Sequence, residues 1–122
     1  MDEKELLQKV LVQYLKDNEP NRLEELDVVF DGVYKTLKAK EAHKTPNEME
    51  SSKELAFNGD PFTQTAMTLA ILAALRFVKE FLKVGFLSDA MDTVQDTLDK
   101  AGIDPGLNAM IRIALEKVIG ST

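Results

Sequence analysis

Residues 66–78 of this chain read AMTLAILAALRFV, and only Thr68 and Arg76 interrupt eleven apolar residues. A helix at a protein surface carries one apolar stripe, whereas a helix that is apolar on nearly every side must be surrounded by other elements. The run is shorter than the about 20 apolar residues that a membrane span needs, so no membrane contact is expected. It predicts a central apolar helix, about 61–84, in an all-α bundle of five or six helices.

The composition of the whole chain is that of one globular domain, residues 1–122, with 44% hydrophobic and 30% charged residues. A net charge of −6 provides no positive field for phosphate groups, which argues against nucleic acid as a partner. The chain contains no cysteine, which excludes disulfides, thiolate nucleophiles and thiolate metal sites. Its acidic start lacks the basic and apolar stretches of a secretory signal, so we expect a cytoplasmic location.

Helix boundaries are marked by capping residues, prolines and glycines. Asp60-Pro61 and Asp104-Pro105 each place proline directly after a residue that caps helix N-termini well. Gly85 follows the central helix and is expected to end it in the left-handed conformation. The apolar periodicity between these signals predicts helices at 2–17, 21–40, 46–57, 61–84, 88–101 and 105–119.

The second of these helices has a competing interpretation. Its apolar residues follow a helical 3-4-3-4 spacing, and Asn21 with Glu24 resembles a capping box. Asp31-Gly32, however, lies between two apolar runs and is typical of a two-residue hairpin turn. Because a lone two-stranded hairpin is marginally stable, we expect a helix over 21–40, with a hairpin across 26–37 as the alternative.

Two surfaces are candidates for contact with a partner. Helix 2–17 is terminal and strongly amphipathic, and its apolar face, which equally suits a core contact, includes Leu7, Leu11 and Tyr14. Helix 88–101 carries an acidic strip of four residues within an arc of about 80°. The strip suits a basic partner or a divalent ion, although charged faces on amphipathic helices are routinely just solvated. It consists of Asp89, Asp92, Asp96 and Asp99.

No pattern in the sequence predicts catalysis, a cofactor or a metal centre. His43 is the only histidine, and no nucleophile or orienting partner accompanies it. The Gly-containing segment 58–61 lacks the glycines and the Lys-Ser/Thr pair of a phosphate loop, so we interpret it as a junction between helices. A group of carboxylates on helix 21–40 is expected on the outer face: Glu24, Glu25, Asp27 and Asp31.

A ligand pocket near the N-terminal end of the central helix is a separate hypothesis. Thr63, Gln64 and Thr65 lie beside the apolar run, and Arg76 lies within it. Ligand sites usually combine an apolar cavity with a few polar groups. This hypothesis predicts a small-ligand carrier or an enzyme.

Residues 94–119 read VQDTLDKAGIDPGLNAMIRIALEKVI and resemble the two helices of ribbon-helix-helix, antitoxin-type regulators. In that family a short basic strand precedes the first helix and reads the major groove as part of a dimer. The corresponding segment here is 81–87, which contains one lysine. The resemblance covers about a fifth of the chain and implies a DNA-binding regulator that uses residues 81–119. It rests on Leu98, the turn Ala101-Gly102-Ile103, Met110, Ile111, Arg112 and Leu115.

The leading prediction is a non-enzymatic helical module that binds a protein partner or a second copy of itself. It rests on the missing catalytic residues and on more apolar helix surface than one small core obviously needs. The DNA-binding regulator and the ligand carrier or enzyme are the two alternatives.

Overall fold

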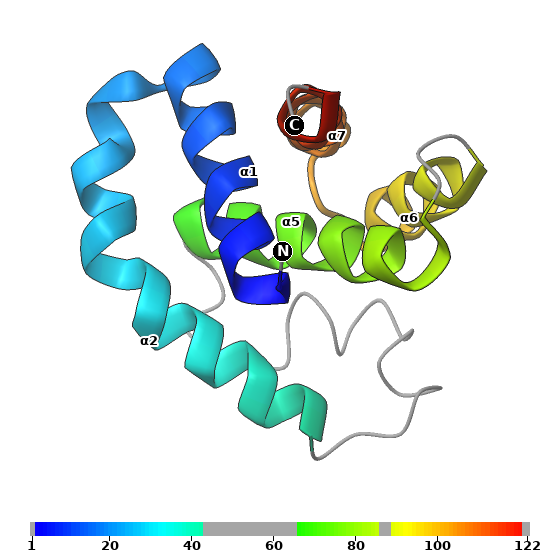
Figure 1. Cartoon of the computed structure of the whole chain (residues 1–122), viewed down its shortest axis with the longest axis horizontal. Helices are drawn as coiled ribbons and strands as arrows, with labels where there is room; N and C mark the ends of the chain where they lie inside the picture. The colour runs from blue at the N-terminus through cyan, green and yellow to red at the C-terminus, as the bar shows by residue number, and fades with distance from the viewer. Residues whose placement is uncertain (1, 43–65, 86–88, 121–122) are drawn as a thin grey trace.

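The computed structural model describes residues 2–42, 66–85 and 89–120, and every element within these ranges is helical. The prediction of an all-α bundle is confirmed. The expected helix 46–57 and the first five residues of the expected helix 61–84 lie outside the described residues. The elements are α1 (Glu3–Asn18), the 3-10 turn η1 (Pro20–Arg22), α2 (Leu23–Ala42), α5 (Ala66–Val84), α6 (Asp89–Lys100) and α7 (Pro105–Gly120) (Figure 1).

Helix α5 is the central element of the described bundle, as its apolar sequence predicts. It packs against α1, α2, α6 and α7, and Figure 1 shows α1 crossing it and α6 at its C-terminal end. Ile71 and Phe77 have no exposed surface, Leu72 and Leu75 are buried, and Leu69 is half-buried. The burial of this apolar surface stabilises the fold by about 25 cal/mol per Å² removed from water.

The structure of α2 decides between the helix and the hairpin that the sequence left as alternatives. Residues 23–42 are helical, so the helix prediction is confirmed and the hairpin across 26–37 is wrong. The reason is burial, because Leu26, Phe30 and Val33 lie on one helical face and pack into the core. The expected capping box at Asn21 does not form, since Asn21 lies inside the 3-10 turn that starts at Pro20.

Helix ends follow the capping chemistry of the sequence. Asp2 accepts a hydrogen bond from the Glu5 backbone N–H at 2.7 Å and caps α1. Asp104 accepts one from the Leu107 N–H at 3.0 Å, which confirms the expected start of α7. Gly85 has a φ of 77° and its N–H donates to the Phe81 carbonyl, which confirms the left-handed end of α5.

Helices α6 and α7 form a hairpin with a tight corner. Gly102 has a φ of 89°, and the Ile103 N–H donates to the Leu98 carbonyl, which is the bonding pattern of a Schellman motif. The buried Asn108 side chain donates to the Asp99 carboxylate at 2.8 Å and ties the two helices together.

The strand implied by the resemblance to ribbon-helix-helix regulators is not observed where the structure describes it. Residues 81–84 form the last turn of α5, while 86–88 lie outside the described residues. Phe81 packs partly against the core in this helical conformation. The expectation of a strand is therefore wrong for 81–84, and the resemblance is limited to the helical hairpin.

None of the described helices combines the length and apolarity that crossing a lipid bilayer requires. The most apolar of them, α5, carries Arg76 and Lys79 and buries its apolar side chains against other helices. The expected cytoplasmic location stays a prediction.

Candidate functional site

The apolar face of α1, expected as a partner surface, is part of the core of this chain. Leu7 and Leu11 have no exposed surface, and Tyr14 is 6% exposed. They are covered because α1 packs against both α5 and α7. A protein partner therefore cannot reach the Leu7 and Leu11 side chains in this conformation, and the core-contact alternative describes the observed packing.

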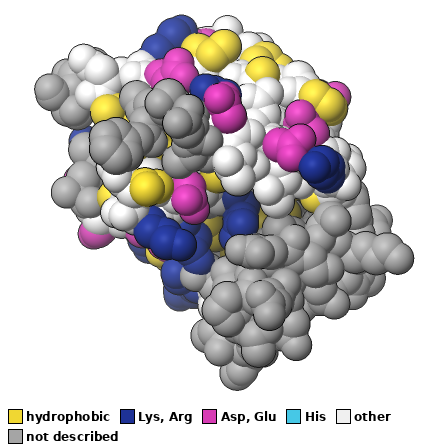
Figure 2. All heavy atoms as spheres, turned by 90° about the vertical axis from the view of Figure 1, so that its right-hand side faces the viewer, with side chains coloured by type: hydrophobic (Ala, Val, Ile, Leu, Met, Phe, Trp, Pro, Cys, Tyr) yellow, Lys and Arg dark blue, Asp and Glu magenta, His cyan; other side chains and the backbone are white. Residues whose placement is uncertain are grey.

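The acidic strip on α6 is largely engaged within the chain. Asp92 pairs with Arg112 of α7, Asp96 pairs with Lys100 at 2.9 Å, and Asp99 accepts from Asn108. Asp89 is the first residue of α6, and its side chain lies outside the described part. Figure 2 shows acidic and basic side chains beside one another on this side of the molecule. Among the described residues, no group of carboxylates is arranged to hold a metal ion.

The carboxylates expected on the outer face of α2 do lie there. Glu24, Glu25, Asp27 and Asp31 are all exposed, and Asp31 pairs with Lys4 at 3.2 Å. His43, segment 58–61 and residues 63–65 lie outside the described residues.

A pocket of about 490 Å³, here called the end pocket, opens between the last turn of α1, η1 and the first turns of α5 and α7. Helix α5 contributes Ala66, Met67, Leu69 and Ala70. Among the described residues, the other apolar side chains of the lining are Leu15, Leu107 and Met110, and the polar ones are Tyr14, Asn18, Glu19, Arg22 and Asp104. Apolar side chains thus form most of the wall, with a few polar groups among them.

Local sequence places the polar groups. Glu19 ends α1, where its N–H donates to the Leu15 carbonyl at 2.7 Å, and Pro20 then starts the 3-10 turn that carries Arg22. Asp104 lies at the pocket because it caps α7. The end pocket therefore uses residues that also define helix ends.

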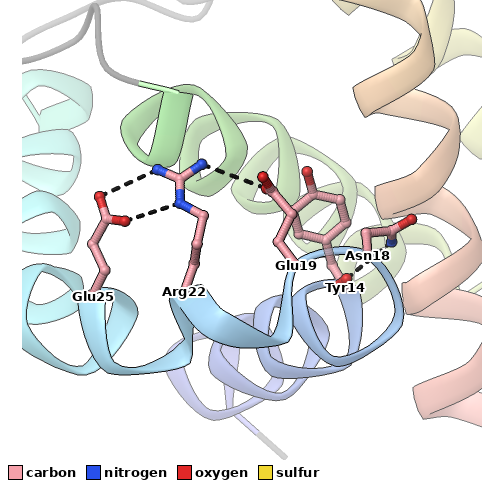
Figure 3. A network of polar contacts seen from close by, with 5 residues as sticks. All are labelled: Tyr14, Asn18, Glu19, Arg22 and Glu25. Carbon is pink, nitrogen blue, oxygen red and sulfur yellow. Dashed lines mark hydrogen bonds and ion pairs between the residues drawn. The ribbon is translucent and has the colours of Figure 1, made fainter.

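Arg22 is held mainly by Glu25. Its Nε and Nη2 atoms donate to the two Glu25 oxygens at 2.9 and 3.2 Å, a bidentate arrangement, whereas its contact with Glu19 is longer, at 3.5 Å (Figure 3). The hydrogen bond with Arg22 lowers the pKa of Glu25, and the same bond raises the pKa of Arg22. Both groups are therefore charged at neutral pH, and the Glu19 carboxylate is only weakly neutralised by Arg22.

The Tyr14 hydroxyl is the most unusual polar group of the pocket. Figure 3 shows the Tyr14 ring on the same side of the chain as the Glu19 side chain. No hydrogen bond joins its hydroxyl to any of the described residues; the Asn18 amide donates to its backbone carbonyl instead. Burial raises the pKa of Tyr14 above 10.0, the Glu19 and Asp104 carboxylates raise it further, and Arg22 opposes them. The phenol is therefore neutral at pH 7 and can both donate and accept a hydrogen bond.

The end pocket lies near the N-terminal end of α5, where the sequence suggested one, but other residues form it. Arg76 is not among its described lining residues, and Glu19, Arg22 and Asp104 were not anticipated as site residues. Proximity between a helix end, a turn and a distant cap is set by packing and leaves no local signal. Comparisons of the chain with protein-family models, curated proteins and solved structures find no match.

Proposed function

We propose that this chain is a non-enzymatic binding protein that takes a small, largely apolar ligand in the end pocket. The observation that carries the proposal is the pocket itself, about 490 Å³ in volume and lined mostly by apolar side chains. Ligand sites in proteins usually measure about 300–1,000 Å³ and combine apolar walls with a few polar groups.

The chemistry of the lining supports binding. A neutral phenol, a guanidinium held by Glu25 and a carboxylate that caps a helix can orient a ligand. Leu69, Leu107 and Met110 are only partly buried, so they retain apolar surface that a ligand would remove from water.

The proposal is tested by titrating the full chain with 1-hexanol and following backbone amide signals by NMR. A ligand of this size is expected to bind with a Kd of about 1 mM. We expect saturable shifts at Leu69, Ala70 and Leu107. Shifts that fail to saturate at about 10 mM, or that spread over the whole surface, would contradict the proposal.

A matched pair of variants tests whether hexanol binds in the end pocket or elsewhere on the surface. Ala66→Phe places a large ring at the pocket wall and should weaken hexanol binding at least about fivefold. Ala39→Phe puts the same ring on an exposed position of α2 that does not line the pocket, and should leave binding unchanged. Equal binding by both variants would show that hexanol occupies another place.

Self-association is a second candidate function, favoured by apolar side chains that remain outside the core. Val28 on α2 is 82% exposed, and Leu82 and Val84 protrude from the end of α5. Light scattering during size-exclusion chromatography tests it, and a strictly monomeric chain at high micromolar concentration would remove it. DNA binding is not proposed, because residues 81–84 are helical.

A further inference from the structure

We infer that the end pocket selects an aliphatic ligand that ends in a primary ammonium group. The inference rests on the proposed function and adds the chemical class of the ligand. It is carried by the Tyr14 hydroxyl, which no described residue bonds, and by the uneven distribution of charge around the apolar wall.

The Tyr14 hydroxyl is a polar group of the end pocket that a ligand can bond. The residue is 6% exposed, and no described residue bonds its hydroxyl. Among the described residues the buried side-chain atom without a partner is Asn108 Oδ1, so the Tyr14 hydroxyl keeps accessible surface at the pocket, where a ligand group can bond it. An ammonium group can donate to the phenol oxygen, and a neutral phenol is a good acceptor for it.

The charges around Tyr14 favour a cation. Glu19 comes from the end of α1 and Asp104 from the start of α7, and both carboxylates line the pocket together with Tyr14. After burial, Glu19 raises the pKa of Tyr14, Arg22 lowers it, and Asp104 raises it by less. Among the described lining residues Arg22 is the one cation, and both oxygens of Glu25 already bind it. The described α5 residues of the wall are uncharged. Glu19 also lies at the C-terminal end of α1, where the helix dipole is negative.

The apolar wall determines the chemistry of the rest of the ligand, beyond its ammonium group. Beyond the polar groups, the pocket offers Leu69, Leu107 and Met110, which have no means of bonding a polar chain. An alkyl chain removes this surface from water while its ammonium group reaches Tyr14 and Glu19. An anionic ligand of the same length would place its charge beside two carboxylates.

Three probes of equal chain length test the inference: hexylamine, 1-hexanol and hexanoate, each titrated into the full chain at pH 7 by NMR. We expect hexylamine to bind about fivefold more tightly than hexanol, because exposed charge pairs contribute about 1 kcal/mol. Hexanoate should bind more weakly than either. Binding of hexanol that equals or exceeds that of hexylamine would overturn the inference while leaving the proposed function intact. Failure of all three probes would overturn both.

Substitutions test which residues cause the preference for hexylamine. Glu19→Gln should reduce hexylamine binding about fivefold, toward the affinity of hexanol, while Glu24→Gln on the exposed face of α2 should not. Tyr14→Phe should weaken hexylamine binding without lowering the urea midpoint, because none of the described residues bonds the hydroxyl. Unchanged hexylamine binding in both Glu19→Gln and Tyr14→Phe would refute the assignment.

Discussion

Gly102 has a left-handed backbone conformation, whereas Gly32 lies inside a helix. Alanine at the two positions should therefore change the stability of the chain in opposite directions. Gly102 has a φ of 89°, where a residue with a side chain loses about 1–2 kcal/mol, so Gly102→Ala should destabilise the chain. Gly32 lies inside α2, and an added Cβ meets nothing within 4 Å, so Gly32→Ala should stabilise by about 0.5–1 kcal/mol. Urea unfolding of both variants checks this, and a shift of the same sign in both would be inconsistent with the structure.

Asp17 and Lys117 join the ends of α1 and α7 at 2.8 Å, and their contact makes a prediction about pH. The hydrogen bond from Lys117, followed by that from Gln13, lowers the pKa of Asp17 below 3.8. A carboxyl whose folded pKa is depressed contributes stability above its unfolded pKa and loses it as the pH falls through the folded value. The contribution of this pair is therefore present above about pH 4 and disappears below it.

The pair is tested by titrating the Asp17 carboxyl carbon by NMR. Lys117→Met should raise the pKa of Asp17 toward 3.8, although Gln13 still donates to the carboxylate. Lys100→Met removes a cation that pairs with Asp96 on α6 and should leave the pKa of Asp17 unchanged. An unaltered pKa of Asp17 in Lys117→Met would show that the contact does not persist in solution.

At the scale of the element, α5 combines large and small buried residues. Ala70, Ala73 and Ala74 are buried on a helix that packs against four neighbours, and short side chains let those neighbours approach closely. Ala73→Leu should therefore overpack the core and destabilise the chain by about 1–3 kcal/mol. The exposed Ala39→Leu on α2 should change stability by less than about 0.5 kcal/mol. Thermal unfolding compares the two, and a neutral Ala73→Leu would contradict the observed packing.

The helices that the structure describes were predictable from sequence because their signals are local. Asp104 and Gly85 act through hydrogen bonds to residues three or four positions away, so the sequence alone predicts the helix ends that they form. The 3-10 turn at Pro20 was missed because Asn21 and Glu24 match a capping box equally well by type. The amphipathic face of α1 was correctly recognised, but periodicity cannot distinguish a core contact from a partner surface.

The end pocket could be anticipated only in its general position. Its polar groups belong to α1, η1 and the cap of α7, and each has an ordinary local role as a helix end. Their convergence depends on how α1, α5 and α7 pack, which is a property of the assembled bundle. The role of the Tyr14 hydroxyl, which none of the described side chains bonds, emerges only in three dimensions, because in the sequence Tyr14 is one more residue on the apolar face of an amphipathic helix.

At the scale of the whole molecule, the account depends on α5 being enclosed by the helices of its own chain. Amides in such a helix exchange with solvent mainly when the molecule unfolds globally. Native-state hydrogen exchange on the full chain, at a dilution where association is absent, measures this directly. The amides of 70–78 are predicted to be the most protected in the chain and to share the protection expected from the free energy of global unfolding. Exchange at 70–78 that is faster than in α1 and α7 would contradict the central position of α5.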